Sequence, residues 1–262
     1  MKEHKFFQNL CIALVLIFLF IPILILIAFS FNESKMNIIF TGFTFDWYAS
    51  LFNNTKLLEA FGNTLIIAIL STFISTIIGT TAAIGLKKFN FPGKKLIEKL
   101  IYVPIVIPEI VIGIALLAVF SLAKVELGFW SVLLAHISFS IPFVITSVRP
   151  VLYSVPDSIE EAAEDLGANP WQAFWHVTLP LIMPGVTSGA LLAFTLSLDD
   201  VVISFFTAGP STNTLPLYIY GIIKTGITPD VNALITLMLI FTVIALLISA
   251  KIANKNIPER RR

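Results

Sequence analysis

The sequence has few charged residues and a single cysteine. Only 13% of its 262 residues are Asp, Glu, Lys or Arg, against roughly 25% in soluble domains. Cys11 stands alone, which excludes an intramolecular disulfide and a metal site built on cysteines. A Gly-x-x-x-x-Gly-Lys-[Ser/Thr] loop is also missing, so the chain cannot bind ATP by that motif. We find neither a nucleophile–base pair nor a metal cluster that would favour a membrane enzyme.

Long apolar runs dominate what is present. The chain is 57% hydrophobic, and its mean hydropathy is +0.92. A membrane-spanning helix needs about 20 mostly apolar residues, and a backbone in lipid must satisfy its own hydrogen bonds. We therefore predict an all-α membrane protein with six transmembrane helices, at about residues 8–30, 62–86, 100–123, 129–148, 185–207 and 232–250. The first apolar run is longer than a signal-peptide core, so we expect it to be retained as an anchor.

The distribution of Lys and Arg predicts the orientation. If the N-terminus is cytoplasmic, the four cations on the outside are Lys35, Lys56, Lys124 and Lys224, and the other thirteen of the 17 are inside. This bias predicts that both termini lie in the cytoplasm. We expect the chain to lie in the cytoplasmic (inner) membrane.

We see no internal repeat and predict three parts: residues 1–59, an N-terminal transmembrane helix with an extracytoplasmic loop; 60–250, a transmembrane core; and 251–262, a basic cytoplasmic tail. The tail favours contact with membrane lipid headgroups over nucleic acid.

The loop at 149–184 contains an acidic helix pattern. Five of the 16 acidic residues lie in it, namely Asp157, Glu160, Glu161, Glu164 and Asp165. Pro156-Asp157-Ser158 is typical of a helix start, and Gly167-Ala168-Asn169-Pro170 ends this helix and begins a second, which we expect to end at Leu179-Pro180. A small alanine face flanked by acids indicates a docking element for a soluble protein. The alternative is an amphipathic helix lying on the bilayer, although such helices are usually basic.

The pattern Glu161-Ala162-Ala163, three residues, Gly167, nine residues, Val177, one residue and Leu179-Pro180 resembles the EAA loop of binding-protein-dependent ABC importer permeases. Val177 stands where that family more often has Ile. The resemblance covers about residues 60–250 and implies the type I importer permease fold. It places a coupling helix here, which inserts into a cleft of an ATP-hydrolysing subunit. We assign Glu160, Glu161, Ala162, Ala163 and Gly167 to this contact.

The same resemblance implies the partners and the absence of catalysis. The chain would be a permease subunit rather than an enzyme, and it would hold no cofactor, because ATP and Mg bind to a partner ATPase dimer. A second, different permease chain would complete the pore as a heterodimer. An extracytoplasmic substrate-binding protein would deliver the solute.

Three acids lie within the apolar runs, Glu109, Asp199 and Asp200, and no Lys or Arg lies deep in any of them. A charge at the centre of a bilayer costs on the order of 3 kcal/mol or more and indicates function. Pro104 and Pro108 should break the helix before Glu109. Because these three acidic side chains have no Lys or Arg deep in the apolar runs to pair with, they predict a positively charged substrate. The adjacent aspartates point about 100° apart, so one can face the pathway while the other caps a broken helix or meets a partner. Alternatively, the acids pair with a second permease chain and serve assembly only.

A second set of segments, 197–204 (SLDDVVIS), 215–220 (LPLYIY) and 228–233 (TPDVNA), resembles the second permease subunit of spermidine/putrescine importers. This implies a polyamine path lined by Ser197, Asp199 and Asp200, with Glu109 below them. Trp47 and its neighbour Tyr48 are candidates for stacking on ammonium groups, or members of an interfacial aromatic belt.

Other readings remain open. Another cation, such as thiamine or ferric ion, would suit the same acids, as would a proton-driven secondary transporter that uses them as a relay. The lone His136 favours an interhelical hydrogen bond over a metal site.

Overall fold

The computed structural model describes residues 2–35, 39–223 and 228–255, and these are helical apart from loops and one isolated bridge between Asn32 and Phe43. Within them, four helices are long and apolar enough to cross a membrane. A sharply bent helix pair makes a fifth crossing if it counts as one span, and the apolar helix segment Pro229–Ile244 is shorter. The all-α membrane fold is confirmed. The predicted six spans are reached only if the bent pair and the shorter helix are both included.

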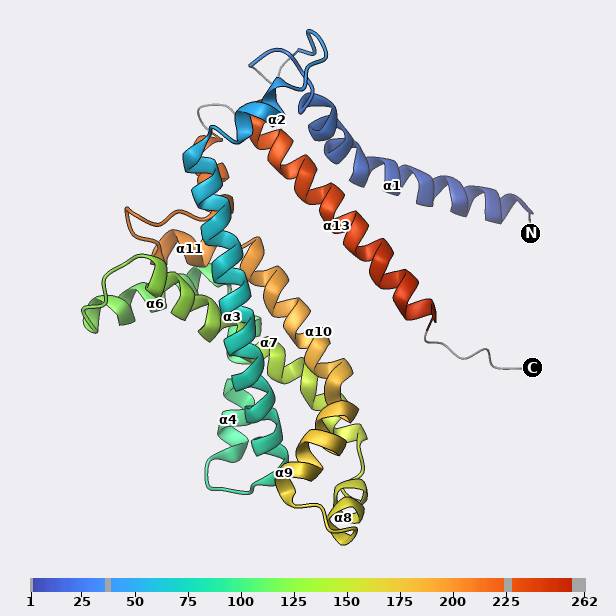
Figure 1. Ribbon diagram of the computed structural model, residues 1–262, viewed down its shortest axis with the longest axis vertical. Coiled ribbons are helices and arrows are strands. Elements are labelled where there is room, and N and C mark those ends of the chain that lie inside the picture. The colour runs from blue at the N-terminus through green and yellow to red at the C-terminus, as the bar shows by residue number, and fades with distance from the viewer. Residues whose placement is uncertain (1, 36–38, 224–227, 256–262) are drawn as a thin grey trace. The chain divides into compact units, whose positions relative to one another are not determined.

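The chain divides into two compact units, Met1–Leu58 with Gly221–Arg262, and Glu59–Tyr220. The first unit contains α1 (Lys2–Phe29), α2 (Asp46–Leu51) and α13 (Pro229–Lys255) (Figure 1). No part of the most apolar window of α1 is buried, as expected for a helix that faces lipid. α2 packs against α13, and Asn54 Nδ2 donates to Asp230 Oδ2 at 2.6 Å.

The three predicted parts stay a prediction. Residues 256–262 of the predicted tail lie outside the described residues.

The second unit holds the remaining helices. In chain order they are α3 (Thr55–Lys88, of which the first residues belong to the first unit), α4 (Lys94–Leu100), α5 (Val103–Val106), α6 (Glu109–Leu122), α7 (Phe129–Ser154), α8 (Ser158–Asp165), α9 (Pro170–Ala173), the π-helical turn η1 (Phe174–Thr178), α10 (Leu179–Leu198), α11 (Val202–Thr207) and α12 (Leu215–Ile222, of which the last two residues belong to the first unit).

Helix α7 forms the centre of this unit and is its most buried span. α10 packs along it, and the two helices run side by side in Figure 1. Two glycines of α10 allow this close approach. A Cβ on Gly185 would lie 3.1 Å from the carbonyl oxygen of Ser147, and one on Gly189 would lie 3.2 Å from the Cα of Val144. The helices therefore meet backbone to backbone, a packing that membrane helices commonly use.

Two of the predicted spans are interrupted. The third is broken between α5 and α6, which meet at an angle of 112°. The break occurs at Ile107 and Pro108, both in extended conformation, because a proline disfavours helix at the residue before it. The predicted break before Glu109 is confirmed. The fifth predicted span, 185–207, is not continuous, because α10 ends at Leu198 and α11 begins at Val202.

The expectation that the second helix of the loop, begun at Trp171, ends at Leu179-Pro180 is wrong. The chain stays helical from Pro170 to Leu198. The π-helical turn η1 lies just before Pro180. A wider turn at this point accommodates a residue that has no N–H to donate and whose ring would clash with the carbonyl four residues back in a regular α-helix. The loop helix and the span that follows it are therefore one rigid element.

Candidate functional site

Helix α8 is short and ends at a glycine in the left-handed conformation. Gly167 has φ +94°, which costs a residue with a Cβ about 1–2 kcal/mol. The amide of Gly167 donates to the carbonyl of Glu164 at 2.9 Å, and that of Ala168 to Ala163 at 3.0 Å. These two bonds form a Schellman C-cap. No described atom lies within 4 Å of a Cβ built on Gly167, so backbone conformation alone favours glycine. The predicted end of the helix is confirmed.

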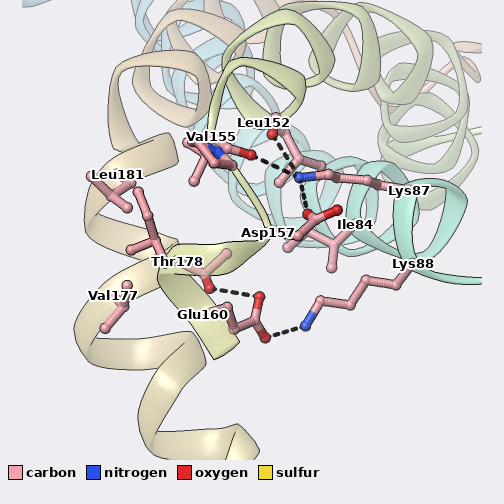
Figure 2. A pocket seen from close by; sticks show the side chains of 12 residues that line it. Ile84, Lys87, Lys88, Leu152, Val155, Asp157, Glu160, Val177, Thr178 and Leu181 are labelled. Carbon is pink, nitrogen blue, oxygen red and sulfur yellow. Dashed lines mark hydrogen bonds and ion pairs between the residues drawn. The ribbon is translucent and has the colours of Figure 1, made fainter. Parts of the chain in front are cut away.

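The two acids in the first turn of α8 have different surroundings. Glu160 pairs with Lys88 of α3, and its Oε2 accepts a hydrogen bond from Thr178 Oγ1 at 3.2 Å (Figure 2). The side chain of Glu161 is exposed and forms no ion pair or hydrogen bond with any described residue. Ala162 is exposed and Ala163 half-buried. Of the predicted coupling residues, Glu161 and Ala162 offer a free surface, whereas Glu160 is engaged within the chain.

Lys87, next to Lys88 at the end of α3, joins α3 to the end of α7. Its Nζ donates to the carbonyl oxygens of Leu152 at 3.2 Å and Val155 at 3.0 Å, and lies 2.7 Å from Asp157 Oδ1 (Figure 2). The last carbonyls of a helix lack partners within it, and a lysine is a suitable donor for them. Nothing in the sequence pattern pointed to these two lysines as more than topology signals, because their partners lie over sixty residues away.

The second helix of the loop begins with a capping box. Asn169 Oδ1 accepts from the amide of Gln172 at 2.9 Å, and Gln172 Oε1 accepts from the amide of Asn169 at 3.0 Å. Trp171 and Trp175 follow, with 68% and 48% of their surfaces exposed. They line an open apolar groove together with Phe174 and residues of α3 and α10. This aromatic surface is built to contact lipid or another apolar chain.

The predicted acids gather at the two helix breaks. Glu109 is the first residue of α6, directly after Pro108, and its side chain is exposed. Asp199 follows the last residue of α10 and is exposed as well. α6, which begins at Glu109, packs against α11, which begins two residues after Asp200. Neither Glu109 nor Asp199 forms an ion pair with a cation in the described part of the chain. The breaks therefore bring two exposed carboxylates to one region.

Asp200 is buried and held on several sides. Its side chain accepts from the amides of Ile203 at 3.0 Å and Ser204 at 2.7 Å, at the N-terminus of α11. His136 Nε2 lies 3.3 Å from Asp200 Oδ2. Of the two alternatives for the aspartate that does not face the pathway, capping a broken helix is the one that the structure shows for Asp200.

Ser197 belongs to the same buried network. Ser71 Oγ of α3 donates to Ser197 Oγ at 3.1 Å, and Ser197 Oγ lies 2.7 Å from His136 Nδ1. His136 Nε2 also lies 3.1 Å from Ser204 Oγ. If Ser197 donates to Nδ1, a neutral imidazole with its proton on Nε2 satisfies all these groups. The predicted interhelical hydrogen bond of His136 is confirmed, and the network ties α3, α7, α10 and α11 together at the break.

Trp47 lies in the other unit, on α2. Its Nε1 donates to the backbone oxygen of Asn32 at 2.6 Å, and the ring is half-buried. The neighbouring Tyr48 contacts Phe31 and Phe45 and hydrogen-bonds to Ser30 at 2.8 Å. Both residues therefore have structural roles in the segment that follows α1. That Trp47 contacts the substrate stays a prediction.

These features define the class of protein. The family model of the binding-protein-dependent transport system inner membrane component matches residues 75–262, and the chain belongs to this family. It is thus a multi-pass, non-catalytic membrane permease, as predicted. Its fold is that of type I ABC importer permeases. The crystal structure of a bacterial ABC transporter involved in the import of the acidic polysaccharide alginate superposes with a TM-score of 0.73 at 17% identity, over 98% of this chain and 97% of that one.

Relatives at higher identity have named substrates. The chain is 43% identical to the spermidine/putrescine transport system permease protein PotC of Escherichia coli strain K12, over 86% of this chain and 85% of that protein. It is 39% identical to the putrescine transport system permease protein PotI of the same strain, over 80% of this chain and 77% of that protein.

Proposed function

We propose that this chain is a permease subunit of an ABC importer and forms half of the pathway for polyamine uptake. The observation that carries the substrate class is the pair of exposed carboxylates, Glu109 and Asp199, at two helix breaks whose helices α6 and α11 pack together. Neither carboxylate pairs with a cationic side chain among the described residues. A carboxylate in this setting is stabilised by a positively charged solute. Relatives that cover most of the chain are named for spermidine and putrescine, which supports a polyamine over other cations such as thiamine or ferric ion.

In this proposal the acids have different roles. Glu109 and Asp199 bind successive ammonium groups, because both are exposed. Asp200 and Ser197, which were predicted to line the path, are buried and hold the break in shape through His136 instead. Trp47 offers an aromatic face to an ammonium group on the outer side. The ammonium groups must bind weakly enough to be released inward, which suits carboxylates that water can reach.

The partners follow from the family and from α8. A binding-protein-dependent system supplies an extracytoplasmic substrate-binding protein. A second, different permease chain completes the pore, with the apolar groove at Trp171 and Trp175 facing that chain or lipid. Two copies of an ATPase, which hold ATP and Mg, receive α8 through Glu161, Ala162, Ala163 and the turn at Gly167. The chain then lies in the bacterial cytoplasmic membrane with α8 and both termini in the cytoplasm.

Uptake of radiolabelled spermidine and putrescine tests the function, in cells that lack their own polyamine importers and express the whole complex. We expect uptake with the wild-type chain and at least about tenfold weaker apparent affinity with Asp199→Asn, because a hydrogen bond to a charged group is lost. Glu126→Gln removes an exposed acid outside the helices and serves as the control. No uptake by an assembled wild-type complex would remove the polyamine assignment.

The energy source separates an ABC importer from a proton-driven transporter. Uptake should survive a collapsed proton gradient and stop when ATP is depleted. The opposite result would make the acids a proton relay and would contradict the assignment of α8 to an ATPase.

A further inference from the structure

Two adjacent lysines at the end of α3 form ion pairs and hydrogen bonds with α8 and with the segment that precedes it. The ammonium of Lys87 has three acceptors, the carbonyls of Leu152 and Val155 and the carboxylate of Asp157. Because a lysine has three N–H donors, this set uses all of them. Only 17% of the Lys87 side chain is exposed. The contact therefore fixes the end of α7 and the residue that precedes α8 to the same point on α3.

Lys88 makes the second contact, directly on α8. Its ammonium pairs with Glu160, whose other oxygen accepts from the buried hydroxyl of Thr178 in η1 (Figure 2). One carboxylate thus joins three elements: α3, α8 and the helix that continues into α10. Glu160 has 20% of its side chain exposed, which leaves little of it for another protein.

The elements behind these ion pairs are closely packed. The cavity that they enclose has a volume of about 20 Å³, and Ile84, Leu152, Val177 and Leu181 are among the residues that line it. This is room for a single water molecule at most. The charged residues, together with Glu161 and Glu164, also line an open hollow of about 330 Å³. The ion pairs themselves therefore hold α8 at its distance from α3, and a displacement of α8 must either break them or carry α3 with it.

We infer that Lys87 and Lys88, with Asp157 and Glu160, form a clamp that makes α3 and α8 move together when the ATPase acts. This inference rests on the proposed function, in which α8 receives the motion of the ATPase. Glu160 then acts as a positioning residue inside the chain, and the exposed Glu161 makes the contact with the ATPase. The clamp extends the coupling site from α8 to the end of a transmembrane helix.

Helix α3 leads from the clamp to the acidic break. Ser71, which donates to Ser197 in the His136 network, lies on the same uninterrupted helix as Lys88. The seventeen-residue separation corresponds to about 26 Å along the helix axis. A rigid helix held at both ends gives a contiguous physical connection between the ATPase side and the residues around Asp199.

Charge exchange tests the clamp in the purified complex, reconstituted with its binding protein, by measuring spermidine taken up per ATP hydrolysed. Lys88→Glu and Glu160→Lys should each lower this ratio about threefold or more, and the double variant should restore it to within about twofold of wild type. Lys95→Glu and Glu126→Lys, exposed residues outside the clamp and outside α8, are the matched controls and should leave the ratio near wild type. A double variant no better than the worse single variant would overturn the clamp.

A distance measurement separates failure of the clamp from failure of the polyamine assignment. Spin labels on Thr81→Cys in α3 and Glu164→Cys in α8, with Cys11 replaced by Ser, report whether the two helices keep their separation between the nucleotide-free and ATP-trapped complex. We expect one unchanged distance, and a broader or shifted one in Lys88→Ala, whatever solute is carried. A distance that changes on ATP binding in the complex with an intact clamp would contradict the inference. If no ATPase associates with the wild-type chain, the proposed function and the clamp fail together.

Discussion

His136 Nε2 lies 3.3 Å from Asp200 Oδ2, and the two side chains, each 3% exposed, join the N-terminal half of α7 to the start of α11. The carboxylate also caps α11 by accepting the amides of Ile203 and Ser204. A buried charge at a broken membrane helix is thus satisfied within the chain. The adjacent Asp199 is left exposed at the same break, with its backbone position fixed from both sides.

His136→Ala should destabilise the chain and weaken transport together. It leaves the buried Asp200 and Ser197 without the imidazole that bonds to both, which costs about 1–3 kcal/mol for each unsatisfied group. We expect a lower midpoint of thermal aggregation for the purified complex, followed by size-exclusion chromatography. His176→Ala is the control, because His176 is exposed and bonds only to the carbonyl of Gln172 among described residues. Equal midpoints for the two variants would contradict the role of His136.

Asp199→Asn should weaken substrate binding alone, whereas Asp200→Asn should also lower thermal stability. Asp199 is exposed, so its neutralisation should raise the apparent KM for spermidine without lowering thermal stability. Asp200→Asn leaves one side-chain oxygen where two accept bonds, and it removes the partner of His136, so stability should fall as well as uptake. Parallel melting and uptake curves test this. Loss of stability in Asp199→Asn alone would reverse the assignment.

Gly167→Ala should weaken the association with the ATPase. The left-handed backbone at Gly167 costs alanine about 1–2 kcal/mol, which is relieved if the turn after α8 changes shape. Gly167→Asn should be milder, because asparagine tolerates this conformation. Gly93→Ala is the matched control, since Gly93 has φ +88° at the start of α4. Co-purification of the ATPase with each variant is the measurement, and similar losses for Gly93→Ala would argue against a specific role for the α8 turn.

Pro108→Ala should impair uptake more than Pro104→Ala does. Pro108 keeps Ile107 extended at the 112° bend before Glu109, whereas Pro104 lies in the first turn of α5, a position that tolerates proline. With alanine at 108 the chain can straighten there and carry Glu109 away from the aspartates. Spermidine uptake at matched expression compares the two. Normal uptake in Pro108→Ala would show that the bend does not depend on the proline.

Local chemistry made part of this structure predictable. Glycine after an acidic helix predicts the turn at Gly167, because only a residue without a Cβ adopts that backbone freely. Pro108 predicts the break before Glu109, because a proline disfavours the helical conformation at the residue before it. Pro180 led to the wrong prediction of a helix end, because a proline usually ends a helix. The π-helical turn that accommodates this proline has no signature in the neighbouring sequence.

The sequence by itself determined the membrane class, the acidic helix that ends at Gly167 and the presence of acids in an apolar setting, because hydropathy, charge and spacing act over a few helical turns. Only the tertiary structure decided which of these acidic side chains pair with another described side chain and which stay exposed. Asp199 and Asp200 are neighbours in the chain, but only Asp200 meets His136, sixty-four residues away, and only Glu160 of the α8 acids meets Lys88. Such partners depend on which helix faces pack together, and a pattern within one helix does not specify its neighbour.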